Sequence, residues 1–103
     1  MMLRFTKENW ERFKTPGKTT TIRMKRLKPG VYNCYGGSRY KPEKLGQVVV
    51  EEGPDVMSVY GLILSDALND GFESLAELLI ELAHLNPKLK ATNDVYIHKV
   101  KVV

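Results

Sequence analysis

Residues 46–64, GQVVVEEGPDVMSVYGLIL, contain two predicted strands and are the segment most informative about the architecture. Residues 46–52 and 56–64 are rich in β-branched and aliphatic side chains, which favour strands. Only Gly53-Pro54-Asp55, a compact turn, separates them. A crossover between parallel strands needs about a dozen residues, so connections this short favour antiparallel or mixed pairing. Because residues 56–64 carry apolar side chains on both faces, we expect this strand to be the most buried.

The remaining segments predict a few further strands and helices. Strands are expected at residues 19–24, 31–35 and 94–103, helices at residues 7–14 and 74–85, and a helical turn from residue 65 to Gly71. The helix at 74–85 is predicted from a capping box, Ser74 to Glu77, and from the leucine stripe behind it, which we expect in the core. These elements predict an α+β fold built as a mixed or antiparallel β-barrel of five to six strands with two to three helices.

Length and composition indicate one domain, residues 1–103. The hydrophobic fraction of 43% and charged fraction of 27% are those of a folded chain. No apolar run is long enough to span a membrane, and the first twelve residues lack the apolar core of a signal peptide, so we expect a cytoplasmic protein. A single cysteine, Cys34, excludes an internal disulfide and a cysteine-rich zinc module. We expect no cofactor, no metal, no membrane contact and a monomer.

The net charge of +4 conceals a division along the chain. Residues 1–44 hold twelve Lys and Arg against three Glu, a balance of +9, whereas residues 45–103 hold four Lys against nine acids, a balance of −5. This asymmetry suggests a positive face and an anionic partner such as nucleic acid. The alternative is that the two parts neutralise one another across the folded surface.

The segment Gly17-Lys18-Thr19-Thr20-Thr21-Ile22-Arg23 is the first candidate binding site. It is not a phosphate-binding P-loop, because the required upstream glycine is Arg12 and because a strand follows it where a P-loop has a helix. Strand alternation places Thr19, Thr21 and Arg23 on one face, with Lys18 at the start of the strand. Two hydroxyls and a guanidinium can bind a phosphate, a carboxylate or a base edge. The alternative is a strand face that is merely solvated.

Four sequence blocks, in order, resemble the ASCH domain family. They are Gly17-Lys18-Thr19-x-Thr21-x-Arg23, Pro29-Gly30, Lys44-Leu45-Gly46, and Ala67-x-x-Asp70-Gly71-Phe72-x-Ser74-x-x-Glu77-Leu78. The resemblance covers the chain from residue 17 to the final strand. It implies a β-barrel related to the PUA domain, in which the Lys18–Arg23 strand and the Asp70-Gly71-Phe72 turn line a common cleft. It also implies binding of RNA or of a modified nucleoside.

One bacterial branch of small ASCH proteins, which hydrolyses the acetyl amide of N4-acetylcytidine, resembles the chain further. Carried over by position, its catalytic lysine falls on Lys18 and its threonine on Thr21, while its glutamate falls on Asp70, which is one methylene shorter. A lysine with a lowered pKa can deprotonate water or a hydroxyl, and a hydroxyl can attack the amide or orient the water. The resemblance therefore implies an amidohydrolase as the alternative to a binding module. A small interaction domain with a vestigial cleft is the third possibility.

Several other side chains are assigned from their local pattern. Arg39, Tyr40 and Lys41, in a glycine-bounded loop, are expected on the rim of the cleft, where Tyr40 can stack on a base. Trp10 and Phe13 are expected in the core, and Cys34 as a small buried side chain. His98, beside Lys99 and Lys101 in the last strand, is expected at the surface.

The acidic residues around the Gly71 turn are the remaining group to assign. Asp66, Asp70 and Glu73 could hold a metal, but such residues more often cap helices, and Asp66 lies where a cap is needed. We therefore expect capping rather than metal binding here.

Overall fold

The computed structural model describes residues 1–38 and 40–103. Its elements are, in chain order, β1 (Met2–Arg4), α1 (Lys7–Glu11), β2 (Thr20–Arg23), β3 (Gly30–Gly37), β4 (Pro42–Val50), β5 (Asp55–Ser58), a 3-10 turn η1 (Val59–Gly61), α2 (Leu64–Asn69), α3 (Leu75–Leu85) and β6 (Asp94–Val102). The predicted α+β class is confirmed as one six-stranded mixed sheet with three α-helices. No helix in the described part of the chain has the length and apolarity to cross a membrane.

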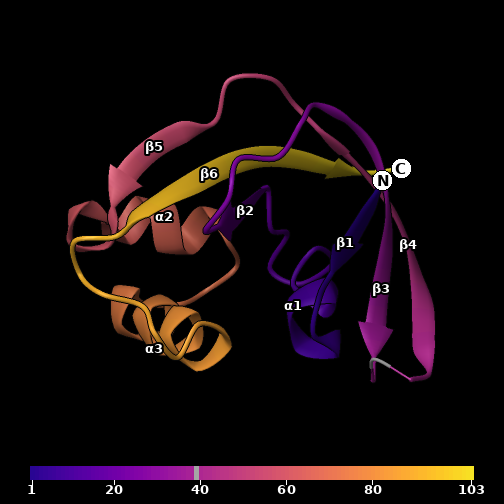
Figure 1. Cartoon of the computed structure of the whole chain (residues 1–103), viewed down its shortest axis with the longest axis horizontal. Coiled ribbons are helices and arrows are strands. Elements are labelled where there is room, and N and C mark those ends of the chain that lie inside the picture. The colour runs from indigo at the N-terminus through magenta and orange to yellow at the C-terminus, as the bar shows by residue number, and fades with distance from the viewer. Residues whose placement is uncertain (39) are drawn as a thin grey trace.

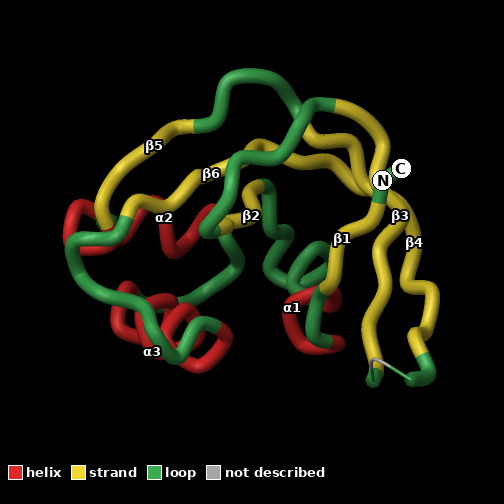
Figure 2. The backbone as a smooth tube through the Cα atoms, in the orientation of Figure 1, coloured by secondary structure: helices red, strands yellow, loops and turns green. Residues whose placement is uncertain are grey.

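The last strand, β6, holds the sheet together. It pairs antiparallel with β4 at residues 100–102, with β2 at residues 96–99 and with β5 at residues 94–97. In Figures 1 and 2 this strand runs across the molecule, with α2 and α3 near one end and the β3–β4 hairpin near the other. At that second end the chain termini lie close together. The one parallel pairing joins β1 to β3.

The sheet is not closed into a barrel. Its hydrogen-bonded order is β1-β3-β4-β6-β2, with β5 attached to β6 beside this path. Thus β1 and β2 are the two ends of the path, and among the described strands they do not pair with each other. We call the space between these two ends the seam.

Two hydrophobic clusters lie on either side of the seam. The first joins α2, α3, η1 and β6 through residues such as Leu78, Leu82 and Val95. The second joins β1, α1, β3 and β4 through Phe5, Trp10 and other side chains. Phe13 packs partly buried against this second cluster, so the expected core positions of Trp10 and Phe13 are confirmed, as is burial of Cys34. The fold therefore has two small cores with a junction between them.

Residues 56–64 do not form the predicted buried strand. The strand β5 ends at Ser58, pairs only with β6 and is half exposed, and the chain then turns through η1 into α2. The apolar pattern has another origin, because Val59 and Leu62 point into the first cluster while Tyr60 and Ile63 lie in solvent. Apolar residues on both faces here reflect a turn, not a buried strand.

Helix boundaries follow the capping residues. The Ser74 hydroxyl accepts a hydrogen bond from Glu77 N at 3.2 Å, and α3 runs to Leu85 as predicted. In α1 the Thr6 hydroxyl caps Asn9 N at 3.1 Å. This helix ends at Glu11 rather than Lys14, because Phe13 and Lys14 donate to carbonyls three residues back, which tightens the chain into turns. Asp66 accepts from Ile63 N at 2.9 Å and so caps α2, as expected.

His98 is buried, which corrects its predicted surface position. Its exposed fraction is 0%. The backbone N–H of Leu27 donates to His98 Nε2 at 3.2 Å, so the imidazole is an acceptor and therefore neutral there. Burial lowers the pKa of His98 below its ordinary value, and the nearby Arg23 and Arg26 act in the same direction.

We predict that the free energy of unfolding decreases as the pH falls below about 6.5, the ordinary pKa of histidine. The unfolded chain then binds a proton on His98 that the folded chain excludes, so protonation favours unfolding. Urea unfolding of the wild type and of His98→Gln between pH 8 and pH 5 tests this. The variant should lose less stability over that range than the wild type. Parallel curves for the two proteins would contradict the prediction.

Candidate functional site

A pocket of about 590 Å³ opens at the seam. It is lined by β1 and the segment before α1, by β2 and the residues after it, by the Asp70 turn, and by the inner face of α3. Its walls thus come from both hydrophobic clusters, with Phe5 on one side and Leu78 and Leu82 on the other. Leu85, expected in the core, is instead half exposed at this pocket. The volume lies within the range of about 300–1,000 Å³ that small-molecule sites occupy.

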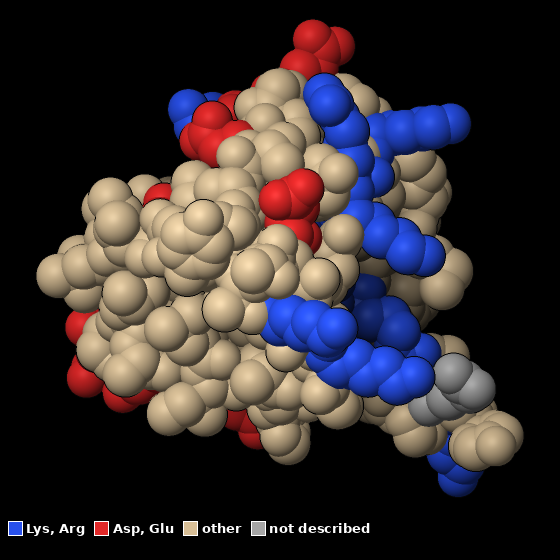
Figure 3. Space-filling model, turned by 60° about the vertical axis from the view of Figure 1, so that its left-hand side comes forward, with Lys and Arg blue, Asp and Glu red and all other residues tan. Residues whose placement is uncertain are grey.

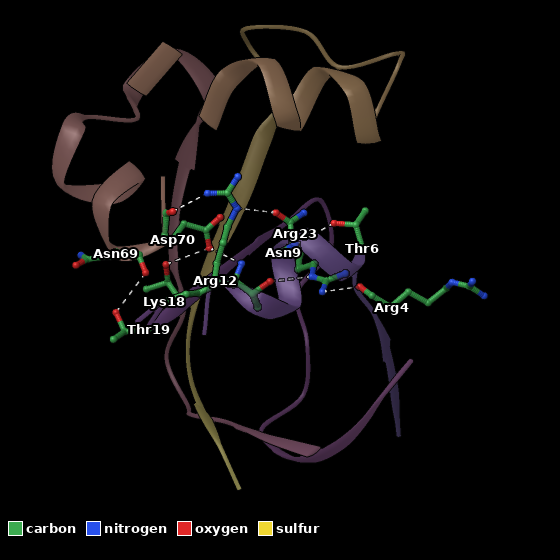
Figure 4. Close-up of polar contacts among 12 residues, drawn as sticks. Arg4, Thr6, Asn9, Arg12, Lys18, Thr19, Arg23, Asn69 and Asp70 are labelled. Carbon is green, nitrogen blue, oxygen red and sulfur yellow. Dashed lines mark hydrogen bonds and ion pairs between the residues drawn. The ribbon is translucent and has the colours of Figure 1, made fainter. Parts of the chain in front are cut away.

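A buried ion pair forms the polar centre of the pocket. Lys18 Nζ donates to Asp70 Oδ1 at 3.0 Å across 52 residues of sequence. The side chains are only 3% and 7% exposed. Thr20 Oγ1 lies 3.4 Å from the same carboxylate oxygen, and Asp70 Oδ2 accepts no hydrogen bond within the described residues. Figure 4 shows Lys18 and Asp70 meeting between β2 and the end of α2.

Backbone contacts hold the two charged residues in place. Lys18 N donates to Arg12 O at 2.7 Å, and Thr19 N donates to Asn69 O at 2.8 Å, so the chain before β2 is tied to both α1 and α2. The ammonium of Lys18 lies 5.6 Å and 5.5 Å from the ring centres of Phe5 and Phe13. Aromatic faces attract a cation but give it no counter-charge, so Asp70 supplies the compensation.

Burial changes the acid–base chemistry of the pair. Burial lowers the pKa of Lys18, and the neighbouring Arg23 and Arg12 lower it further, although Asp70 opposes this. Burial likewise raises the pKa of Asp70, against the opposing charge of Lys18. Burial thus disfavours the charged forms of both groups, while their contact at 3.0 Å favours these charged forms. A lowered pKa makes the Lys18 amine a better general base than an exposed lysine.

Arg23 bridges the seam from the end of β2. Its Nε donates to Thr21 Oγ1 at 3.1 Å, and its Nη2 donates to the carbonyl of Arg4 in β1 at 3.0 Å. The guanidinium carbon lies 4.6 Å from the centre of the Phe5 ring. One side chain thus connects the two unpaired ends of the sheet, and Thr21 and Arg23 share the face that the sequence predicts for them.

Arg12 supports the Asp70 turn. The sequence pattern did not predict this role. Arg12 Nε donates to Asn9 Oδ1 at 3.2 Å (Figure 4), and Arg12 Nη1 donates to Gly71 O at 2.7 Å. The guanidinium carbon of Arg12 lies 4.0 Å from the centre of the Phe72 ring. Asn9 lines the pocket, as do Arg4 and Phe5. Nothing local in the first twelve residues indicates this, because β1 takes its place by pairing with β3, about thirty residues away.

The other predicted site residues lie elsewhere. Thr19 is exposed, and its hydroxyl lies 3.4 Å from Asn69 O instead of in the pocket. Tyr40 is 92% exposed and, like Lys41, does not line the pocket. Arg39 lies outside the described residues. Gly37, the last residue of β3 before this loop, lines the pocket, and its carbonyl accepts a hydrogen bond from Arg4 Nη2 at 2.9 Å.

Lys and Arg are unevenly distributed on one face of the molecule (Figure 3). Figure 3 shows Lys and Arg as a band over one side of that face, with most Asp and Glu on the other side and at the upper edge. On this face the cations therefore do not intermix evenly with the acids (Figure 3).

Comparisons with protein-family models, with curated proteins and with solved structures found no match.

We predict strong coupling between Lys18 and Asp70 in a double-mutant cycle. Lys18→Met or Asp70→Leu alone leaves a buried charge without its partner and should cost about 3–5 kcal/mol of unfolding free energy. The double variant should cost less than the sum by more than about 1 kcal/mol, because it leaves no buried charge. Urea denaturation measures all four proteins. Additive losses would show that the two side chains do not compensate one another.

We also predict that the Asp70 turn requires glycine at position 71. Gly71 has φ +89°, and an added Cβ would lie 2.8 Å from Arg12 Cβ. Gly53 is the matched control, since its φ is +75° and nothing lies within 4 Å of an added Cβ. Gly53→Ala should cost about 1 kcal/mol from backbone strain alone. Gly71→Ala should cost about 1–3 kcal/mol more from the clash, and equal losses by urea denaturation would refute this.

Proposed function

We propose that the pocket at the seam binds RNA or a modified nucleoside. The observation that carries the proposal is the buried Lys18–Asp70 pair facing a pocket of about 590 Å³ beside Arg23. A buried ion pair is costly to maintain, and hydrophobic replacement is often neutral or stabilising, so its presence in a cavity points to a role in binding or chemistry. Phe5 and Phe72 offer aromatic surface in the same pocket, which suits a base.

We propose further that the chain is an ASCH-type domain and that its sheet is a PUA-like barrel left open at the seam. The support is that Lys18, Thr21 and Arg23 line one pocket with Asp70, which is the common cleft that the resemblance implies. The side chain of Arg23 spans the two ends of the strand order, at the place where a closed barrel would have backbone pairing.

An amidohydrolase acting on N4-acetylcytidine is the second candidate. The specific observation in its favour is that Asp70, despite being shorter than glutamate, reaches Lys18 Nζ at 3.0 Å. The lowered pKa of Lys18 supplies the base that amide hydrolysis needs.

In this candidate reaction, neutral Lys18 takes a proton from a water molecule that the Thr21 hydroxyl orients. The water oxygen attacks the acetyl carbon and the bond from that carbon to N4 breaks. Lys18 then returns the proton to N4, so that cytidine and acetic acid leave, the latter ionising in solvent. Asp70 holds the charged amine between the two transfers.

Binding is tested by calorimetric titration of the protein with cytidine and with a short single-stranded RNA. We expect Lys18→Met to weaken cytidine binding about tenfold or more, since it removes a charged donor. RNA binding should weaken with added salt and with Arg23→Ala, because phosphates contribute there. Lys41→Ala should weaken RNA but not cytidine binding, since Lys41 lies outside the pocket.

Lys14→Met is the matched control, because Lys14 is exposed, lies outside the pocket lining and forms an ion pair with Glu11 at 4.0 Å. Its ligand affinities should equal those of the wild type. Backbone NMR of the wild type provides a readout that does not depend on the stability of a variant: cytidine should shift the amide signals of Thr21, Gly37 and Leu82. Absence of such shifts at millimolar cytidine would overturn the proposed function.

Release of acetate separates the enzyme from the binding module. Chromatography of N4-acetylcytidine with substoichiometric protein should show turnover if the second candidate is right, and Lys18→Met should abolish it. Binding of cytidine without turnover would reject the amidohydrolase and support a binding module.

A further inference from the structure

The charge inventory of the pocket is unbalanced. Its lining includes four cations, at Arg4, Lys18, Arg23 and Lys25, and two acids, at Asp70 and Glu81. Asp70 forms an ion pair with Lys18 at 3.0 Å. Of the ion pairs among residues 1–38 and 40–103, none includes Arg4, Arg23 or Lys25. Three cations therefore surround the β1–β2 side of the pocket without a carboxylate in contact.

Arg23 is the most constrained of these cations. It is half-buried beside the Phe5 ring, and two of its nitrogens are used, Nε on Thr21 Oγ1 and Nη2 on the carbonyl of Arg4. Its Nη1 donates to no atom of the described chain. Because a guanidinium has five N–H donors, an unused edge remains for a ligand. Burial lowers the pKa of Arg23, and the negative charge of Asp70 opposes this shift.

Thr21 adds a neutral donor at the same place. Its oxygen accepts from Arg23 Nε at 3.1 Å, which leaves the hydroxyl hydrogen to donate elsewhere. Thr21 is buried and lines the pocket. Arg4 and Lys25 are exposed residues of the pocket lining, and the Arg4 guanidinium donates to Gly37 O at 2.9 Å.

The cations lie on one side of the pocket. They come from β1, β2 and the residue after Met24, where Phe5 and Ile22 also line the pocket, whereas α3 contributes Leu78, Leu82 and Leu85 together with one acid, Glu81. A ligand that spans the pocket therefore meets the cationic donors at one end and the α3 leucines at the other. A free inorganic anion would leave the α3 side empty, and a neutral nucleoside would leave the cations without a partner.

We propose that this end of the pocket is a phosphate subsite, so that the preferred ligand is a nucleotide carrying a terminal phosphate rather than a nucleoside. The inference rests on the proposed function and names its ligand class. Arg23 Nη1 and the Thr21 hydroxyl donate to the phosphate oxygens, and Arg4 and Lys25 complete the neutralisation. Three cations match the charge of a phosphate monoester, which approaches −2, better than the single charge of a phosphodiester.

Calorimetric titration of the purified protein with cytidine, cytidine 5′-monophosphate, the dinucleotide CpC and inorganic phosphate tests the proposal. The monophosphate should bind about tenfold or more tightly than cytidine, because charge-assisted hydrogen bonds are added. It should also bind more tightly than CpC, which has a phosphodiester only, and than phosphate alone.

Substitutions then identify which residues make the monophosphate bind more tightly than cytidine. Arg23→Gln should remove most of the advantage of the monophosphate over cytidine, measured as the ratio of the two affinities in the same variant. Lys25→Gln, at an exposed position that does not threaten folding, should reduce the advantage in part. Arg26→Gln is the matched control, since it removes the same charge from the same loop but lies outside the pocket lining, and it should leave the advantage intact.

The outcomes separate this inference from the proposed function. If cytidine binds and the phosphate adds nothing, the phosphate subsite is wrong and the proposed function stands. If CpC binds more tightly than the monophosphate, the site reads an internal phosphodiester and the inference of a terminal phosphate is overturned. If neither cytidine nor its monophosphate binds, both are wrong. If Arg23→Gln and Arg26→Gln reduce the advantage of the monophosphate over cytidine equally, the advantage comes from the overall positive charge of the protein. That result would overturn the phosphate subsite.

Discussion

The contact between Lys18 Nζ and Asp70 Oδ1, 3.0 Å long and almost wholly buried, organises this structure. It joins the segment before β2 to the end of α2 and so brings the basic and acidic parts of the chain together. Around it, Arg12 holds the carbonyl of Gly71 and Thr19 N holds that of Asn69. An ion pair out of water persists only when geometry and further hydrogen bonds compensate for lost hydration, and here both elements are fixed by backbone contacts.

The open sheet explains why a cavity lies beside this pair. The strand path ends at β1 and β2, and the hydrophobic side chains divide into two clusters, one on each side. Backbone pairing between β1 and β2 would close the seam. Instead the guanidinium of Arg23 reaches the carbonyl of Arg4, which leaves room for a pocket and directs a cation toward it. The proposed nucleotide site thus depends on an unclosed sheet as much as on its charged residues.

Sequence patterns correctly predicted the elements whose boundaries depend on interactions between residues close in sequence. Ser74 and the leucine stripe specify α3 because a capping hydroxyl and a 3.6-residue period act within a few turns. The predicted buried strand at residues 56–64 is wrong, because the sequence does not distinguish the apolar side chains of a turn from those of a buried strand. For His98 the signal was available, since Lys99 and Lys101 occupy exposed positions, and strand alternation then directs His98 inward.

By itself, the sequence determined the α+β class, the strand at β2, the helix α3 and the candidate status of Lys18, Thr21, Arg23 and Asp70. Only the tertiary structure decided that Lys18 and Asp70 touch, that Thr19 and Tyr40 lie away from the pocket, and that Arg4, Asn9 and Arg12 belong around the site. The physical reason is the separation along the sequence over which each kind of interaction acts. Capping and periodicity act over a few residues, whereas the site is assembled by contacts such as Arg12 to Gly71, across 59 residues, whose free energy exists only once the chain has folded.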